Sequence, residues 1–404
     1  MTFLLDTPKN SDDRFWRTTL TFHVRADNHE GHDVGHDGPE VGRAGWWLTS
    51  GLCSLALAVA TVAGQPAQPA FTVERVFGPE IATGPYKHPA CVTDLANGDL
   101  YLVYYGGEGE YAQDTAVFGS RLAKGHTTWS PPQVIAADPF RSLGNGVVWQ
   151  APDAVVWLFY VVRYGATWST SRIQAKISRD NAATWSDAFM LHEAEVMMVR
   201  NRPIVLHDGD YLLPIYHETG NDPEAVGADS TSSFLRYQRA SGQWKQTGAI
   251  RSAKGVIQPA VVEIAPGRLI AYNRRGGGYG PTTDGWLIRA ESTDGGWTWT
   301  SGRDSAFPNP NAAVDFLKLK SSHLLLVYND SMVHRTPLVA ALSTDGDKTY
   351  ARRRAIAEGA GDFAYPIAVQ TADQRIHVVY TSDGRRVINH AVFTEEWLLS
   401  APTR

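Results

Sequence analysis

The sequence predicts an all-β protein, a six-bladed β-propeller of four-stranded antiparallel blades. Three observations favour this fold: a turn motif that repeats, aromatic residues that recur at nearly constant spacing, and six apolar runs that could each be a strand. The composition agrees, because the 404 residues include 37 Gly, 13 Trp and 16 Tyr while only 20% are charged. Such a composition is typical of many short strands joined by tight turns.

The repeated motif reads Ser-x-Asp-x-x-x-Thr-aromatic. Three copies span residues 178–185, 292–299 and 343–350, and degenerate copies end at Trp129 and Trp244. Successive aromatic positions lie 51 to 59 residues apart, a length that accommodates four short strands and their turns. The Asp and Ser of each copy can bind backbone amides of a turn. We therefore expect the motif to be structural, with its aromatic ring packed between neighbouring blades.

Six alternating or apolar runs, one per repeat, are the clearest predicted strands. They cover residues 99–105, 154–161, 211–216, 268–273, 323–329 and 375–381. Several follow turn residues such as Asn97-Gly98-Asp99. No stretch beyond the apolar run at 45–63 shows a convincing helical period, so the blades are expected to fill the chain.

The first part of the chain differs from the remainder. Residues 1–42 are polar and aperiodic, and we interpret them as a disordered or mis-assigned extension, with translation starting near Val41 as the corresponding hypothesis. Residues 43–64 have the basic start, apolar centre and small-residue end of a secretory signal, although the apolar run is also long enough for an N-terminal membrane anchor. The propeller is expected to span residues 65–404, secreted or periplasmic in a bacterium and without a membrane span once the signal is removed.

Charge and cysteine content exclude several classes of function. A net charge of −5 provides no basic field for a nucleic acid. The two cysteines, Cys53 and Cys91, exclude a disulfide scaffold and a Cys-rich zinc site. No metal-ligand spacing rises above background in residues 71–404, so we expect no metal and no cofactor, and we expect a monomer.

The repeated motif resembles the Asp-box, or BNR repeat, of sialidases, and the resemblance covers roughly residues 75–398. Tyr86-Lys87-His88-Pro89 stands where sialidases carry an aromatic-Arg-Ile-Pro motif. Further segments in sialidase order are residues 258–274, 335–343 and 363–366. The chain is similar to a divergent, sialidase-like BNR group, whose hallmarks are seen at residues 201–203, 215–218, 257–259, 308–311 and 380–381.

This resemblance implies an exo-acting glycosidase that hydrolyses a carboxylated, sialic-acid-like sugar in a central pocket. Arg274 and Arg335 would hold the carboxylate, because guanidinium groups bind it bidentately. Tyr365 would be the nucleophile, since a carboxylate nucleophile would be repelled by the substrate. Ion pairs between blades remain the alternative for the two arginines, and core packing for the tyrosine.

Several positions depart from the sialidase pattern. Lys87 replaces the first arginine, with His88 beside it as a hydrogen-bond donor or an acid/base. Gln258 stands at the position of the glutamate that accepts the nucleophile's proton. The general acid is expected in residues 106–114, where Glu108, Glu110 and Asp114 compete and Glu110 is favoured.

Other residues near the predicted pocket are candidate substrate ligands. Arg200 occupies an equivalent blade start and is expected to be a further ligand-binding arginine. Tyr216 and Glu218 form either a substrate wall or an internally satisfied polar cluster. Asn311, in the Pro-Asn-Pro-Asn segment at 308–311, is expected either to shape a turn at the pocket rim or to bind sugar hydroxyls through its amide.

Two other functions stay open. One is β-elimination on a uronic-acid polymer, with tyrosine and histidine as base and acid and Gln258 helping to neutralise the carboxylate. The other is a non-catalytic carbohydrate-binding propeller, favoured by the absence of Glu at 258 and Arg at 87. In all three, the expected partner is an acidic glycan or glycoconjugate.

Overall fold

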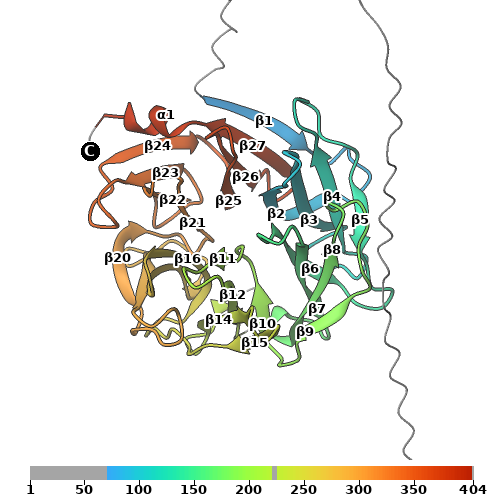
Figure 1. The fold of residues 1–404 in the computed structure, drawn as a ribbon, viewed down its shortest axis with the longest axis horizontal. Helices are drawn as coiled ribbons and strands as arrows, with labels where there is room; N and C mark the ends of the chain where they lie inside the picture. The colour runs from blue at the N-terminus through green and yellow to red at the C-terminus, as the bar shows by residue number, and fades with distance from the viewer. Residues whose placement is uncertain (1–70, 221–224, 403–404) are drawn as a thin grey trace, which may run out of the picture. The chain divides into compact units, whose positions relative to one another are not determined.

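The computed structural model describes residues 71–220 and 225–402, and these form a closed ring of six blades (Figure 1). Each blade is a four-stranded antiparallel sheet, except that the inner strand of the third is divided into two short pieces. The predicted fold class is therefore confirmed. The predictions for residues 1–42 and 43–64, including a start near Val41, lie outside the described residues.

The first three blades follow the chain without a crossover. The first contains β2 (Tyr86–Asp94), β3 (Leu100–Gly107), β4 (Ala116–Leu122) and β5 (Gln133–Ala136). The second contains β6 (Leu143–Gln150), β7 (Val156–Arg163), β8 (Ser171–Ser178) and β9 (Phe189–His192). The third contains β10 (Met197–Val199) and β11 (Ile204–Val205), then β12 (Tyr211–His217), β14 (Thr231–Gln238) and β15 (Gln243–Gln246).

The remaining blades complete the ring. The fourth contains β16 (Val256–Ala265), β17 (Arg268–Arg275), β19 (Trp286–Ser292) and β20 (Arg303–Pro308). The fifth contains β21 (Asp315–Lys318), β22 (Leu324–Asn329), β23 (Leu338–Ser343) and β24 (Arg352–Ala357). The sixth contains β25 (Ala364–Gln370), β26 (Ile376–Ser382), β27 (Val387–Phe393) and, from the start of the described chain, β1 (Phe71–Phe77).

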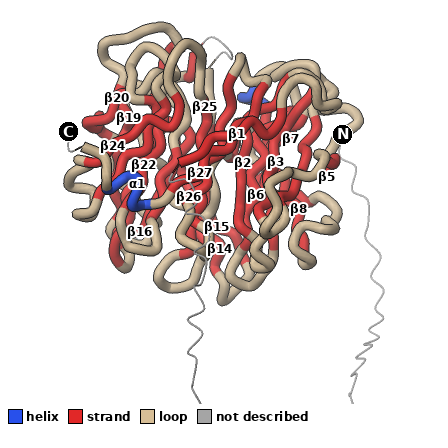
Figure 2. The backbone as a smooth tube through the Cα atoms, turned by 90° about the horizontal axis from the view of Figure 1, so that it is seen from above, coloured by secondary structure: helices blue, strands red, loops and turns tan. Residues whose placement is uncertain are grey.

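The N-terminal strand β1 closes the ring. It pairs antiparallel with β27, so that Phe71 lies opposite Phe393 and the last blade holds both ends of the described chain (Figure 2). The Phe71 ring also stacks on Trp397 at 4.6 Å, in the short helix α1 (Glu395–Leu399). The strand from the start of the described chain thus completes the last blade next to the first.

The six predicted runs are the second strands of the blades: β3, β7, β12, β17, β22 and β26. Because neighbouring strands alternate in direction, the first strand of each blade starts on the face where second strands end. We call this the upper face; it carries the loops between second and third strands. The Asp-box turns join third to fourth strands and so lie on the opposite, lower face.

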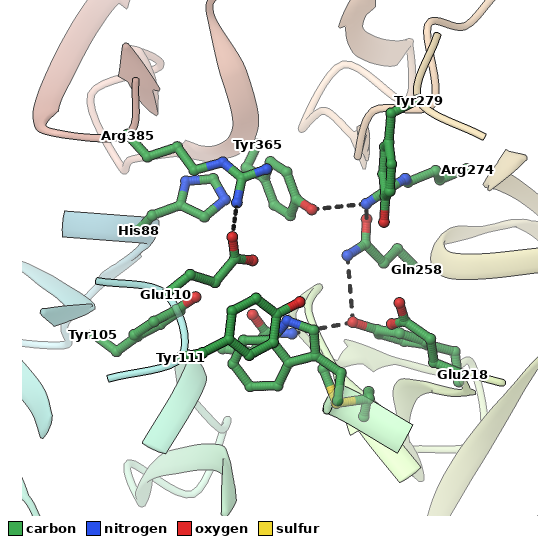
Figure 3. Close-up of a pocket in the computed structure, with 14 residues that line it drawn as sticks. His88, Tyr105, Glu110, Tyr111, Glu218, Gln258, Arg274, Tyr279, Tyr365 and Arg385 are labelled. Carbon is green, nitrogen blue, oxygen red and sulfur yellow. Dashed lines mark hydrogen bonds and ion pairs between the residues drawn. The ribbon is translucent and has the colours of Figure 1, made fainter. Parts of the chain in front are cut away.

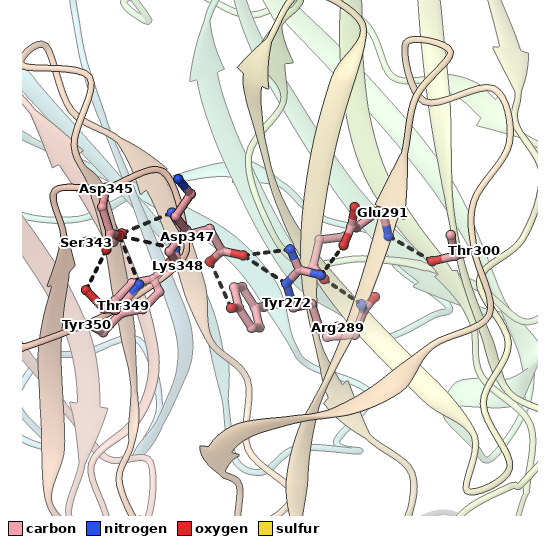
Figure 4. Close-up of polar contacts among 12 residues, drawn as sticks. Tyr272, Arg289, Glu291, Thr300, Ser343, Asp345, Asp347, Lys348, Thr349 and Tyr350 are labelled. Atoms are coloured by element: carbon pink, nitrogen blue, oxygen red, sulfur yellow. Dashed lines mark hydrogen bonds and ion pairs between the residues drawn. The ribbon is translucent and has the colours of Figure 1, made fainter.

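The Asp-box turns are hydrogen-bonded internally, as predicted (Figure 4). In the fifth blade, Asp345 accepts hydrogen bonds from the Thr349 amide at 2.9 Å and the Thr349 hydroxyl at 2.7 Å, and Ser343 donates to it at 2.8 Å. These bonds stabilise the carboxylate and lower the pKa of Asp345 to about 2. The ring of Tyr350 then packs against Phe307 of the preceding blade, with centroids 5.0 Å apart.

The same contact recurs around the ring. The aromatic residue of each Asp-box packs on the blade before it: Trp185 on Tyr101, Trp244 on Trp157, Trp299 on Phe234, and Trp129 on His390. The motif therefore links neighbouring blades.

Two further short elements lie on the upper face. A 3₁₀ turn, η1 (Trp168–Thr170), follows the second strand of the second blade. A two-stranded ladder joins β13 (Ala225–Val226) to β18 (Gly277–Gly278), and thereby the upper loops of the third and fourth blades. Within residues 71–220 and 225–402, none of the helices has the length and apolar character needed to cross a membrane.

Candidate functional site

A cavity of about 110 Å³ opens at the centre of the upper face (Figure 3). Of the thirteen candidate residues that the sequence singled out, seven line it: His88, Glu110, Tyr216, Glu218, Gln258, Arg274 and Tyr365. They come from four of the six blades, the first, third, fourth and sixth, at strand ends and upper loops. The tertiary structure therefore brings together residues that are up to 277 positions apart in the sequence.

The first strands bend where they enter this cavity. The pairing register shifts at β6, β16 and β25, and the bulged segments hold non-glycine residues in the left-handed region: Asn145 at φ 45°, Gln258 at 53° and Tyr365 at 56°. Asn311, just before β21, has φ 57°. Such conformations cost about 1–3 kcal/mol each and are concentrated at functional sites. Here each bulge turns a polar side chain toward the ring centre.

Tyr365 lies at the middle of a group of arginines. Its hydroxyl accepts a hydrogen bond from Arg274 Nη1 at 2.7 Å. The guanidinium groups of Arg200, Arg335 and Arg274 lie 5.2, 5.5 and 5.8 Å from the centre of its ring. Burial raises the pKa of Tyr365, but the positive charges of Arg274, Arg335 and Arg385 outweigh it, and the net pKa is below the usual value of 10. The arginines therefore favour ionisation of Tyr365 relative to an ordinary tyrosine.

Arg274 is held by three side chains. Its Nε donates to Asn311 Oδ1 at 2.6 Å and its Nη1 to Gln258 Oε1 at 3.1 Å. Gln258 Nε2 in turn donates to the Tyr216 hydroxyl at 3.3 Å, which also receives a bond from Asn145 at 3.0 Å. Gln258 accepts on one side and donates on the other, which an ionised glutamate cannot do. The amide at position 258 therefore fits this network.

Two carboxylates line different parts of the cavity, as Figure 3 shows. Glu110 forms an ion pair with Arg385, whose guanidinium also donates to the Tyr86 hydroxyl at 3.3 Å. Glu218, which is 5% exposed, lies near Arg274 and Tyr216. Both acids can therefore reach a bound sugar.

His88 is a buried, neutral imidazole. Its Nδ1 lies 2.7 Å from Thr381 Oγ1, and the Thr381 hydroxyl donates its single proton to the carbonyl oxygen of Ala364. With the Thr381 proton on the Ala364 carbonyl, Nδ1 donates and the lone pair lies on Nε2. Burial and the charges of four arginines hold the pKa of His88 well below 6.5. Nε2 has no hydrogen-bond partner within the described part of the chain.

Lys87 does not reach the cavity. Along β2 the side chains alternate, so Tyr86 and His88 face the centre while the Lys87 ammonium donates to the carbonyl oxygens of Ile81, at 3.3 Å, and Gly84. Arg385, which the sequence analysis missed, supplies a guanidinium there instead. Arg385 follows the second strand of the sixth blade, just as Glu110 follows the second strand of the first. This equivalence of position in the repeat could have identified Arg385 from the sequence.

The other predicted residues lie behind the cavity wall. Asp114 accepts two bonds from the Glu108 amide, both at 3.2 Å, and so closes the loop that carries Glu110. Arg335 donates to the Asn311 carbonyl at 3.0 Å, and burial lowers the pKa of Arg335 to about 10. Arg200 is 1% exposed and donates to the Pro366 carbonyl at 3.2 Å. These residues act on the cavity through Tyr365, Arg274 and the loop.

Sequence reasoning also missed the aromatic part of the wall. Tyr105, Tyr111, Trp168 and Tyr279 line the cavity. They lie at the ends of second strands or in upper loops, without a motif of their own. Among the described residues, no group of three or more His, Cys, Asp or Glu side chains could hold a metal ion.

Comparison with known proteins identifies relatives of this architecture. Residues 98–378 match the family model described as a BNR repeat-like domain. No curated protein matches the chain.

Solved structures with the same fold are distant in sequence. The Hadza microbial sialidase Hz136 is 16% identical, with a TM-score of 0.65 over 78% of this chain and 67% of that one. The intramolecular trans-sialidase from Ruminococcus gnavus, solved with oseltamivir carboxylate, is 12% identical, with a TM-score of 0.67 over 81% and 98%. A protein of unknown function from Dyadobacter fermentans is 16% identical, with a TM-score of 0.65 over 80% and 99%. At this identity the likeness establishes the fold.

Proposed function

Because this chain belongs to the BNR repeat-like family and has a sialidase-like propeller fold, we propose that it is a glycosidase acting on a carboxylated sugar. The observation that carries the proposal is the Tyr365 hydroxyl, hydrogen-bonded to Arg274 and surrounded by further guanidinium groups. These charges lower the free energy of the tyrosinate, which is the nucleophilic form. No carboxylate at position 258 is needed for that activation.

In this mechanism Arg274 and Arg385 bind the substrate carboxylate. Tyr365 Oη attacks the anomeric carbon and forms a bond to it while the bond to the leaving oxygen breaks. Glu110 gives a proton to that oxygen, and then takes one from the water that releases the sugar from Tyr365.

The Glu110–Arg385 ion pair connects binding to proton transfer. A substrate carboxylate competes with Glu110 for Arg385. When the substrate carboxylate takes Arg385, Glu110 loses this ion-pair partner and can contact the leaving oxygen instead. Glu110 is therefore the proposed general acid, whereas Asp114 shapes the loop.

One observation favours a second candidate, β-elimination on a uronic-acid glycan. His88 is neutral, buried and has an Nε2 lone pair without a hydrogen-bond partner in the described chain. It could take the proton from the carbon next to a uronic carboxylate, while Arg274 neutralises that carboxylate. His88, protonated by that step, would then give the proton to the leaving oxygen.

The test is turnover of purified protein on sialosides and on glycosides and oligomers of uronic acids. A new reducing end with no ultraviolet absorbance is expected, and indicates hydrolysis. An unsaturated product that absorbs in the near ultraviolet would instead indicate elimination. Tight glycan binding without product would indicate a non-catalytic propeller. If the protein shows no binding and no turnover, an acidic glycan is excluded as its partner.

A further inference from the structure

A second hollow adjoins the central cavity on the upper face, between the first two blades. It has a volume of about 270 Å³, close to the lower end of pockets that hold small molecules, about 300 Å³. Its walls come from three upper loops, at residues 111–113, 140–142 and 163–165. Tyr111 lines both this hollow and the central cavity. We call the hollow the side pocket.

The side pocket has an excess of positive charge. Arg141 and Arg163 line it, and no acidic residue of the described chain does. The central cavity, by contrast, pairs Arg274 and Arg385 with Glu110 and Glu218. Asp138, which does not line the side pocket, forms an ion pair with Arg141 at 3.5 Å, and Arg163 adds a second positive charge. The charge of the side pocket therefore suits an anion.

A buried hydroxyl in the side pocket lacks a partner. Ser142 lines it and is 4% exposed, and its Oγ makes no hydrogen bond within the described residues. Buried polar groups are almost always hydrogen-bonded. Ser142 is therefore a hydroxyl at the wall of the side pocket that the described part of the protein leaves unpaired.

The rim of the side pocket is aromatic. Phe140 is 75% exposed, the largest value among the exposed hydrophobic residues of the described chain. Tyr164, 41% exposed, is held by the guanidinium groups of Arg141 at 4.6 Å and Arg172 at 4.4 Å from its ring centre. An exposed ring beside cations offers an apolar surface for the C–H face of a sugar next to donors for its anionic group.

The side pocket is also tied to the loop of the proposed general acid. Gln113 donates to the Phe140 carbonyl at 3.2 Å, and Arg163 donates to the Tyr111 carbonyl while its guanidinium lies 4.7 Å from the Tyr111 ring centre. Tyr111 and Gln113 belong to the same upper loop as Glu110 and directly follow it in the chain. A ligand in the side pocket would therefore lie beside the leaving-group side of the central cavity.

We propose that the side pocket binds the neighbouring sugar of the substrate and that this sugar also carries an anionic group. The substrate class is then a glycan with two consecutive acidic sugars, the first in the central cavity and the second against Arg141, Ser142 and Phe140. This inference rests on the proposed function for the location of the cleaved bond. It adds the chemical class of the leaving group, an acidic sugar.

The experiment measures binding by calorimetry and turnover separately, with probes that share the first acidic sugar and differ in the group attached to it. The first pair is α2,8-linked disialic acid and 3′-sialyllactose, and the second is digalacturonic acid and methyl galacturonide. We expect the wild-type protein to bind the acidic dimer of one pair at least about tenfold more tightly than its partner. Arg141→Ala should abolish this preference and Phe140→Ala should weaken both members of the pair.

Arg179→Ala is the matched control, because Arg179 is an exposed arginine in an Asp-box turn on the lower face. It should retain the preference. The proposal is overturned if the wild-type protein binds the two members of each pair equally or binds none, or if Arg141→Ala keeps the preference. Absence of turnover with the preference intact would instead contradict the proposed glycosidase and leave the side pocket supported. The substituted side chains are 41% and 75% exposed, so both variants should fold.

Discussion

The lower face and the upper face of this propeller are built from the same blades but differ in how their polar groups are hydrogen-bonded. On the lower face, the Asp-box turns satisfy their own polar groups: Asp180 binds the amide and hydroxyl of Thr184, and Asp294 does the same with Thr298. On the upper face, strands are bulged, and buried atoms such as His88 Nε2 and Arg200 Nε lack partners in the described chain.

This difference indicates where stability and chemistry reside. The lower turns repeat because every blade must dock on the one before it, and the same hydrogen bonds serve each junction. The upper loops do not repeat, because each contributes a different group to one central cavity. Among the upper-face groups, His88 Nε2 lies at the central cavity, where a ligand can satisfy it.

The largest effect is expected at the centre of the upper face. Tyr365→Phe removes the hydroxyl but keeps the ring that the arginines contact, so turnover of carboxylated glycosides should fall by about 10³-fold or more while the melting temperature stays close to that of the wild type. Steady-state kinetics and thermal unfolding measure both. Tyr237→Phe, on the outer part of the third blade, is the control, and full activity in Tyr365→Phe would show that the reaction takes place elsewhere.

The opposite result is expected on the lower face at Asp347. Its carboxylate side chain is 1% exposed and accepts bonds from Tyr272 at 2.9 Å, Tyr350 at 2.7 Å and Arg289 at 2.8 Å, across two blades (Figure 4). Asp347→Ala leaves Arg289 without this partner and should lower the free energy of unfolding by about 3 kcal/mol. Denaturant titration measures this loss.

The folded Asp347→Ala protein should keep its kcat, because the residue lies on the face opposite the cavity. A proportional fall in kcat at a temperature where the variant is fully folded would contradict the separation of the two faces.

A smaller loss is expected for the proposed general acid. Glu110→Gln should lower kcat by about 10²-fold on natural glycans, and much less on aryl glycosides whose leaving group needs no proton. The ratio of the two losses is the measurement. Asp114→Asn, in the same loop, should show no such dependence on the leaving group, and an equal loss on both substrates in Glu110→Gln would exclude an acid role.

The smallest effect concerns pH and the lower turns. Hydrogen bonds from Thr349 and Ser343 lower the pKa of Asp345 from 3.8 to about 2 in the folded state. A carboxyl with a depressed folded-state pKa contributes stability above its unfolded pKa and loses it as the pH falls toward the folded value. The wild-type unfolding midpoint should therefore decline between about pH 5 and pH 2, and Asp345→Asn should show a shallower decline. Identical slopes would contradict the contribution of the turn.

The site was predictable only in part. Arg274 and Tyr365 could be identified because each belongs to a recognisable strand segment, and the structure places them in hydrogen-bond contact. Lys87 was predicted to line the cavity but points away from it, whereas Arg385, which was not predicted, lines it. Whether residue 87 or 88 faces the cavity depends on the register of β2, which shifts between His88 and Cys91, and a bulge of this kind leaves no periodic signal in the sequence.

By itself the sequence determined the number of blades, their second strands and the lower turns, because these depend on local chemistry: alternating apolar residues and side chains that bind their own backbone. Only the tertiary structure decided which upper-face groups meet. Tyr86 and Arg385, like His88 and Thr381, are separated by nearly 300 residues, and their contact follows from closure of the ring between β1 and β27. The chemistry of the cavity is a property of that closure, since no single blade contains enough of its residues to form a site.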